Sequence, residues 1–456
     1  MGERREEDFM GQVPVPGDAW YGSQTARALE TFRISGIPFP LACIRAVARI
    51  KRHMAEAHLS LGLLPGDLAE SVIQAAREVE EGGLADQFVV DVFQTGSGTS
   101  SHMNANEVIA GRANEILTGQ RGGKSPVHPN DHVNLGQSTN DVIPTAIRLS
   151  TALALERDLV PALASLAESL RDKAREFDRI LKIGRTHFQD AVPMRLSSDF
   201  SAWARQVELG LESSCRAVVS LLPLPLGGTA VGSGVNAHPD AAPMAIRALA
   251  EDTGMGFFPA PHRLEAQGSG DAYAASHAAL RNTALSLMKI AQDLRFLSSG
   301  PRSGIGELSL PALLPGSSFM PGKINPVACE VVLQAGAQVL GNDAAVAAAC
   351  QAGGLELFCM QPLCAHNLLF SATLLSNSAR MLDEKCVRGI RANEARMARG
   401  VEDSPALATL LAPRLGYDLA ADLARRALAS GRTVRDLAVE EGILTPGEWE
   451  DLLGKL

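Results

Sequence analysis

Two long helical stretches, residues 271–299 and 327–351, constrain the fold more than any other part of this sequence. Both are unusually rich in alanine, valine and leucine, and these side chains cover most faces of each helix. A helix that is apolar on most of its faces has to be buried on most sides. The sequence therefore predicts a helical bundle with these helices in its core, or a subunit interface continuous with that core.

The rest of the chain also favours a mainly helical protein. Aromatic residues make up only 4% of the 456 residues, and alanine and leucine run through long stretches with helical spacing. We expect two helices between residues 40 and 81, joined at Gly62–Pro65, and about forty residues of helix from 142 to 181 that opens near Pro144. Further helices are predicted at residues 195–222, 239–252 and 362–388.

Charge and cysteine usage argue against several classes of protein. The net charge is −9 without a basic block, so nucleic acid or an anionic membrane surface is not expected as a partner. The charged N-terminus lacks a signal core and no uncharged run approaches membrane-spanning length, which predicts a cytoplasmic protein. The seven cysteines lack CxxC or zinc-site spacing. They indicate small buried residues in a reduced compartment, and no metal or other cofactor is expected.

The two apolar helices are separated by a loop that packing explains poorly. Residues 300–326 contain five glycines and five prolines, which exclude a continuous helix and suggest a loop able to change conformation. Its last part, Gly316–Pro326, carries two adjacent hydroxyls, a lysine and an asparagine. The functional interpretation is a serine made basic, with Lys323 and Asn325 binding anionic oxygen. The alternative is a Gly/Ser connector whose lysine is merely solvated.

Four other turns are rich in glycine or polar residues. Serine, threonine and glycine before a helix normally cap it, and capping is the commoner explanation. The same geometry aims free N–H groups and the positive end of the helix dipole at any anion in front. The turn of residues 128–141 holds more polar side chains than one helix start can use, so water or a polar ligand is expected there. The turns span residues 93–101, 128–141, 184–190 and 226–236.

Together these turns and the loop suit one kind of chemistry. They offer hydroxyls, amides, His128, His187 and Lys323, without a metal-binding set, a Ser-His-Asp order or the GxGxxG of a dinucleotide fold. That inventory suits a dicarboxylate and an elimination or addition at the carbon between its carboxylates. Removing a proton beside a carboxylate gives an enediolate, which needs pre-placed donors. A serine deprotonated among such donors can act as the base.

These motifs resemble the fumarase/aspartase superfamily. Its signature loop GSSxMPxKxN is matched without gaps by Gly316–Asn325, and the resemblance covers essentially the whole chain. Four other segments match in order: Gly96–Asn104, His128–Asp141, Gly184–Asp190 and Gly228–Asn236. The resemblance implies a mainly α, three-domain subunit, and a homotetramer built on a central bundle of long helices with active sites shared by three subunits. The expected domains are residues 1–135, residues 136–388 with the mobile loop 300–326, and a small helical domain of residues 389–456.

The resemblance also implies roles for individual residues. Ser317 would be the catalytic base, and Lys323 and Asn325 would bind the carboxylate that becomes the enediolate. His187 with its partner Glu330 would complete the catalytic set. The positions that match other substrate-binding residues are Ser97, Thr99, Ser138, Thr139, Asn140 and Thr186. The positions that match a second dicarboxylate site are His128, Asn130 and Asp131, although Ser125 stands where that site often has arginine.

These residues give mixed signals about which group leaves the substrate, water or ammonia. Thr95–Thr99 and Val127–Asn134 are fumarase-like, whereas Thr139 and Asn325–Val327 are aspartase-like, and His102 departs from the asparagine usual in both groups. We expect a fumarate hydratase, which adds water reversibly to fumarate to give L-malate. The alternatives are an aspartate ammonia-lyase and a catalytically silent structural homologue.

Overall fold

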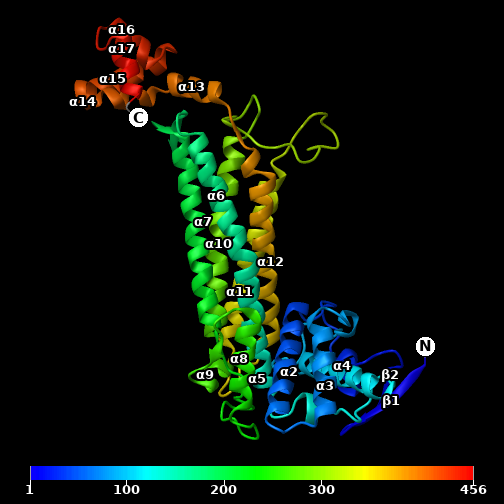
Figure 1. Cartoon of the computed structure of the whole chain (residues 1–456). Coiled ribbons are helices and arrows are strands. Elements are labelled where there is room, and N and C mark those ends of the chain that lie inside the picture. Colours follow the sequence, from blue (N-terminus) through cyan, green and yellow to red (C-terminus); the bar gives the residue numbers. More distant parts are fainter. Residues whose placement is uncertain (1, 455–456) are drawn as a thin grey trace. The chain divides into compact units, whose positions relative to one another are not determined.

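The computed structural model describes residues 2–454 (Figure 1). The contacts within the chain divide these residues into two compact units. Unit 1 consists of residues 2–161, 212–284 and 337–376, and unit 2 of residues 162–211, 285–336 and 377–454. The chain is mainly helical, as predicted. Within the described residues, no helix has both the length and the apolar character needed to cross a membrane.

Unit 1 begins with an antiparallel hairpin followed by packed helices. Strands β1 (Glu3–Asp8) and β2 (Gly11–Pro16) pair in register, and α2 (Leu41–Ser60) packs on α3 (Gly66–Glu80). The pair α2 and α3 confirms the two helices predicted on either side of Gly62–Pro65. The other elements of this unit are α1 (Ser23–Thr31), η1 (Ala85–Gln87), α4 (Thr99–Thr118), η2 (Pro129–Val133), α5 (Thr139–Ala154), η3 (Leu155–Leu159), β5 (Pro223–Leu224), α8 (Ala241–Thr253), β6 (Phe258–Pro259) and α9 (Arg263–Gly268).

The helix expected over residues 142–181 begins earlier and ends earlier than predicted. Ser138 caps α5, because its Oγ accepts the Asn140 N–H at 3.2 Å and the Asp141 carboxylate accepts the Ser138 N–H at 3.0 Å. Pro144 lies inside α5 rather than at its start. The π-helical turn η3 follows α5, and α6 (Val160–Glu176) follows η3. The chain then leaves the helical conformation and forms a strand.

Unit 2 contains a second hairpin that the helical prediction did not anticipate. Strand β3 (Leu181–Thr186) pairs antiparallel with β4 (Gln189–Arg195), with a register shift between Ile183 and Arg185. Two short strands, β7 (Leu308–Ser309) and β8 (Arg391–Ala392), also pair antiparallel. The hairpin lies between helices, at the place where the sequence indicated only a polar turn.

Four long helices run through both units and lie at the predicted positions. They are α7 (Leu196–Leu221), α10 (Asp271–Leu297), α11 (Val327–Gln351) and α12 (Gln361–Lys385). In unit 1, His277 of α10 contacts Asp343 of α11 at 3.0 Å and Ser371 of α12 at 2.9 Å. In unit 2, the Trp203 indole N–H of α7 donates to Asp293 of α10 at 3.0 Å. Buried polar contacts of this kind hold the helices in register and confirm the predicted bundle of long helices.

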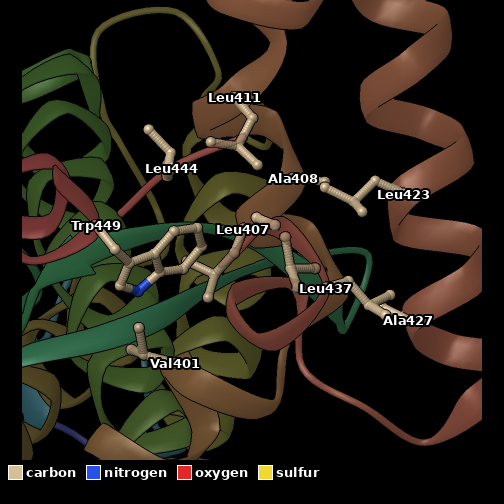
Figure 2. Packing of buried hydrophobic residues seen from close by; sticks show 11 residues of the cluster. Val401, Leu407, Ala408, Leu411, Leu423, Ala427, Leu437, Leu444 and Trp449 are labelled. Carbon is tan, nitrogen blue, oxygen red and sulfur yellow. The ribbon is translucent and has the colours of Figure 1, made fainter. Parts of the chain in front are cut away.

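The chain ends in short helices that share a core of their own. Figure 2 shows this cluster, in which Trp449 is 2% exposed and Leu407 is 1% exposed. Such burial of large apolar side chains is the main source of stability in a small helical assembly. The elements of this part are η4 (Val387–Gly389), α13 (Glu394–Asp403), η5 (Pro405–Leu411), α14 (Ala412–Leu415), α15 (Tyr417–Ser430), α16 (Val434–Glu440) and α17 (Pro446–Gly454).

Candidate active site

In unit 1, the first group of predicted substrate-binding residues lies at the start of α4. Gly98 precedes the helix with a φ of +81°, a conformation that glycine adopts without steric cost. The hydroxyl oxygens of Ser97 and Thr99 lie 2.7 Å apart, so one donates to the other. Because Thr99 is the first residue of a 20-residue helix, both hydroxyls lie at its positive end, where a carboxylate is favoured.

The second group lies at the start of α5. Ser138 is the capping residue, Thr139 is the first helical residue, and the Asn140 side-chain amide donates to the Ala230 carbonyl at 2.9 Å. Asp141 fixes this helix start to the glycine-rich turn, because its Oδ2 accepts the N–H groups of Gly227 at 3.0 Å and Thr229 at 2.9 Å. The predicted residues Ser138, Thr139 and Asn140 are thus held on a helix N-terminus that a third segment braces.

Two buried basic side chains contact residues at or just before the start of α5. Lys51 of α2 donates to Asn134 at 2.7 Å and to Gln137 at 3.0 Å, and burial lowers the pKa of this lysine well below its usual range. His102 of α4 is fully buried, and its Nδ1 lies 2.8 Å from the Thr139 hydroxyl. Burial first, and the Lys51 charge second, lower the pKa of His102 well below its usual range. His102 is therefore a neutral side chain that joins the first predicted group to the second.

Lys51 was not recognised as part of this region from the sequence, and neither was the bracing role of Asp141. Burial raises the pKa of Asp141 to about 6, against the opposing effect of its backbone hydrogen bonds and of Lys51. Lys51 lies in an ordinary helical pattern, and the partners of Asp141 at positions 227 and 229 are more than 80 residues away in the chain. The only sequence signal was the excess of polar residues in the segment 128–141.

The three residues predicted for a second dicarboxylate site lie on one turn of unit 1. His128 caps η2, and its Nδ1 accepts the N–H groups of Asn130 and Asp131 at 3.2 Å each. The His128 N–H donates to the His132 ring at 2.8 Å. Asn130 and Asp131 are exposed. The structure brings these three side chains together, and binding at this turn stays a prediction.

In unit 2, the predicted Thr-His pair lies at the tip of the β3–β4 hairpin. Thr186 ends β3, and the two turn residues His187 and Phe188 have φ of +54° and +59°. Two consecutive residues in the left-handed region form the tight turn that suits a two-residue hairpin. Residues without a glycine's freedom pay a steric cost there, and such strain is typical of functional positions. All three side chains are exposed on this hairpin.

A buried ion pair fixes this hairpin to the beginning of the loop that carries Ser317. Arg185 Nη2 donates to Glu307 Oε1 at 2.7 Å, and Lys182 Nζ lies 3.7 Å from Glu307 Oε2. The Glu307 side chain is 3% exposed and that of Arg185 is 24% exposed. Because Glu307 lies ten residues before Ser317, this contact links the two segments of unit 2 that carry predicted catalytic residues.

Hydrogen bonds close the end of the loop into a ring that includes Ser317. The Gly316 N–H donates to the Lys323 carbonyl at 2.7 Å, and the Asn325 side-chain amide donates to the Gly316 carbonyl at 2.7 Å. A side chain at Gly316 would place its Cβ 2.5 Å from the Lys323 carbonyl oxygen, so the ring closes only with glycine at this position. Ser317 Oγ accepts the N–H groups of Phe319 at 3.1 Å and Met320 at 2.8 Å.

The predicted pair of His187 with Glu330 stays a prediction. Glu330 lies in the first turn of α11, where its N–H donates to the Pro326 carbonyl at 3.2 Å. Among the residues described in a single chain, no hydrogen bond or ion pair joins Glu330 to His187. The predicted site residues thus form two groups, one at the helix starts of unit 1 and one at the hairpin and loop of unit 2.

Comparison with known proteins decides the family. A family model described as a lyase matches residues 11–341, and a model of the fumarase C C-terminus matches residues 407–454. The chain belongs to the fumarase/aspartase superfamily. This confirms the resemblance seen in the five ordered motifs and makes the chain a member of a lyase family.

Relatives in this superfamily match the chain over nearly its whole length. The chain is 46% identical to a class II fumarate hydratase of Bradyrhizobium diazoefficiens over 99% of this chain and 95% of that protein. It is 50% identical to the class II fumarate hydratase of Halobacterium salinarum over 99% of this chain and 96% of that protein.

Solved structures agree with these sequence relatives. A class II fumarase from Schistosoma mansoni matches with a TM-score of 0.95 at 36% identity, over 99% of this chain and 98% of that one. A fumarate lyase:delta crystallin from Brucella melitensis, solved with bound cobalt, matches with a TM-score of 0.94 at 44% identity over the same shares. The fold of this lyase is therefore that of its superfamily over 99% of the chain.

Proposed function

We propose that this lyase is a fumarate hydratase, which adds water reversibly to fumarate to give L-malate. The observation that carries the proposal is the identity of 43–50% over at least 98% of this chain to relatives named class II fumarate hydratases. The two groups of polar side chains, at the helix starts of unit 1 and at the hairpin and loop of unit 2, support a dicarboxylate substrate.

Ser317 is the proposed base. Its Oγ accepts two backbone N–H groups, and hydrogen bonds to an oxygen favour its charged form over its neutral form. An alkoxide held in this way would remove the proton from the carbon of malate that does not carry the hydroxyl. The reverse direction, hydration of fumarate, returns that proton from the same serine.

The charge that develops in this step is an enediolate on the adjacent carboxylate. Lys323 is exposed on the loop and its ammonium group is available to that carboxylate, and the Asn325 side chain lies at the base of the same ring. Donors placed before the reaction stabilise such a charge without reorganisation. We propose that water held by His187 protonates the departing hydroxide.

The helix starts of unit 1 are assigned to binding of a substrate carboxylate. Ser97 and Thr99 at the start of α4, and Ser138, Thr139 and Asn140 at the start of α5, supply hydroxyl and amide donors at positive helix ends. These donors bind the substrate equally in its ground state and in the transition state, so their loss should mainly raise KM.

We further propose that the active enzyme is a homotetramer with sites shared between subunits. Large apolar side chains on the bundle helices are exposed in the single chain, among them Leu285 of α10, which is 48% exposed, and Val331 of α11, which is 44% exposed. Apolar surface of this kind on long helices supports association through this part of the molecule. Sedimentation analysis at several protein concentrations tests the assembly.

One assay tests the reaction and separates it from ammonia addition. The ultraviolet absorbance of fumarate is followed in buffer alone and in buffer with added ammonium. We expect loss of fumarate, with formation of L-malate, in buffer alone. Loss that requires ammonium would identify an aspartate ammonia-lyase instead, and no loss under either condition would contradict both activities.

A further inference from the structure

His102 makes a contact on each side of its ring. On one side its Nδ1 lies 2.8 Å from Oγ1 of Thr139, the first residue of α5. On the other side its Nε2 lies 3.5 Å from Nδ2 of Asn106, one turn further along α4. The ring is fully buried, so bulk solvent does not reach either edge. Its two nitrogens are therefore confined to these two partners.

The orientation of Asn106 favours one tautomer of the His102 ring. A neutral imidazole carries a hydrogen on one nitrogen and a lone pair on the other. In the orientation that the structure gives the Asn106 amide, its nitrogen lies 3.5 Å from both His102 Nε2 and the Met103 sulfur and can donate to each, while its buried oxygen has no hydrogen-bond partner among the described residues. If Nε2 accepts from Asn106, then Nδ1 carries the hydrogen and donates to the Thr139 hydroxyl oxygen.

The direction of the hydrogen bond between His102 and Thr139 decides whether the Thr139 hydroxyl donates to a ligand or accepts from it. A threonine hydroxyl has one hydrogen and lone pairs that accept. When a lone pair of Oγ1 is occupied by His102, the hydroxyl hydrogen stays free for an acceptor. A carboxylate is only an acceptor, whereas the ammonium group of an amino acid is only a donor. With the opposite tautomer, His102 Nδ1 would accept the Thr139 hydrogen, and Oγ1 of Thr139 would present a lone pair to the ligand instead.

We propose that His102 is a positioning residue that donates from Nδ1 to Thr139, so that the Thr139 hydroxyl donates to a substrate carboxylate rather than accepting from an ammonium group. This inference rests on the proposed function, because it assigns a substrate carboxylate to the helix start of α5. It adds a residue that acts through Thr139 and makes this position selective for an anion.

The tautomer is measured directly by nitrogen-15 NMR of the histidine ring in the resting wild-type enzyme, with His102→Asn identifying the signal. We expect a protonated Nδ1 and an unprotonated Nε2. A protonated Nε2 would overturn the proposal, because Thr139 would then donate to the ring and not to the substrate.

Two substitutions test the contributions of the two His102 ring nitrogens separately. The short side chain of His102→Asn places its amide near the position of Nδ1, so it can donate to Thr139, and KM for fumarate should stay within about 3-fold of wild type. The longer side chain of His102→Gln places its amide near the position of Nε2 and abandons Thr139. Loss of an oriented hydrogen bond to a carboxylate should then raise KM about 10–100-fold, with a much smaller change in kcat.

A double-mutant cycle distinguishes positioning from a general structural effect. Thr139→Val keeps the shape of the side chain and removes the hydroxyl. If His102 acts through Thr139, His102→Gln should raise KM by less than about 2-fold in the Thr139→Val background. Equal KM increases in both backgrounds would contradict the proposal, since they would show that His102 acts independently of Thr139.

Binding of succinate, a dicarboxylate that cannot be hydrated, keeps this test separate from the proposed reaction. Calorimetry should show weaker succinate binding to His102→Gln than to wild type, and near wild-type binding to His102→Asn. A wild type that fails to hydrate fumarate but shows this pattern would contradict the hydratase alone. A hydratase in which all three proteins bind succinate equally would contradict the role of His102 alone.

Discussion

The ion pair between Arg185 and Glu307 should be among the most sensitive polar contacts of unit 2. Substituting Arg185→Met removes the 2.7 Å hydrogen bond to Glu307 and leaves a carboxylate that is 3% exposed. Removing one partner of a buried pair costs about 3–5 kcal/mol, because the other charge stays buried without compensation. Arg185 is 24% exposed and Lys182 stays 3.7 Å from Glu307, so we expect a smaller loss of about 2–3 kcal/mol.

The chain offers a matched control on exposed helices of the same unit. Arg171 of α6 pairs with Glu168 and Glu208, and its side chain is 43% exposed. Exposed pairs contribute about 0–1 kcal/mol, so Arg171→Met should change stability little. Urea unfolding, followed by circular dichroism at one fixed protein concentration, compares both variants with wild type.

A second variant tests the cause of the loss. Replacing both partners, Arg185→Met with Glu307→Gln, removes the unpaired charge and should restore at least half of the lost free energy. The single variant should also lower kcat/KM for fumarate, because the pair links the hairpin that carries His187 to the loop that carries Ser317. A stability loss for Arg185→Met no larger than that for Arg171→Met would refute this reasoning.

Three further predictions concern other parts of the molecule. Because burial raises the pKa of Asp141 to about 6 from 3.8, its contribution to stability is full below pH 4 and is lost as pH rises through 6. The unfolding free energy of wild type relative to that of Asp141→Asn should therefore fall by about 3 kcal/mol over this window, as measured by urea unfolding of both proteins at several pH values. His187→Asn should lower kcat for hydration about 100-fold with little change in KM in steady-state kinetics, and unchanged turnover would remove this histidine from the mechanism. Trp449→Ala should lower the free energy of unfolding in urea by about 3–5 kcal/mol, because Trp449 is 2% exposed. Leu428 is 74% exposed, so Leu428→Ala should change the free energy of unfolding by no more than about 0.5 kcal/mol. Equal losses in the two variants would contradict the separate C-terminal core.

The long helices could be predicted from the sequence because their signal is local. Composition and spacing placed α11 at residues 327–351, where the structure has it, and placed α7, α10 and α12 within a few residues. A helix rich in alanine and leucine carries its preference in every turn, so neighbouring segments do not change it. The family motifs were equally direct, since Gly316–Asn325 is contiguous in the chain.

The hairpins were missed because short strands have a weak local signal. Strand β3 has an irregular burial pattern rather than strict alternation, and β4 contains Pro193. The turn at His187 and Phe188 has no glycine or asparagine to announce two residues in the left-handed region. The start of α5 lies ahead of Pro144 because Ser138 and its Asp141 partner form a capping box.

The buried network behind the helix starts could not be predicted, because its contacts are long-range. Lys51 reaches Asn134 and Gln137 from 83 and 86 residues away. In the sequence His102 stands out only as a departure from the asparagine usual in the superfamily, and its contact with Thr139 spans 37 residues. Such pairings depend on how helices pack, which neither periodicity nor a single motif specifies.

The central claim, that a serine on the loop is the base of a fumarate hydratase, is tested most directly by substituting that serine. Hydration of fumarate by Ser317→Ala is compared with wild type and with Ser318→Ala, which removes the neighbouring hydroxyl instead. We expect Ser317→Ala to keep its assembly state and to lose about 10²–10⁴-fold in kcat, the usual contribution of a positioned acid or base. Ser318→Ala should stay within about 10-fold of wild type. A Ser317→Ala enzyme that hydrates fumarate at the wild-type rate would contradict the assignment of this residue as the base.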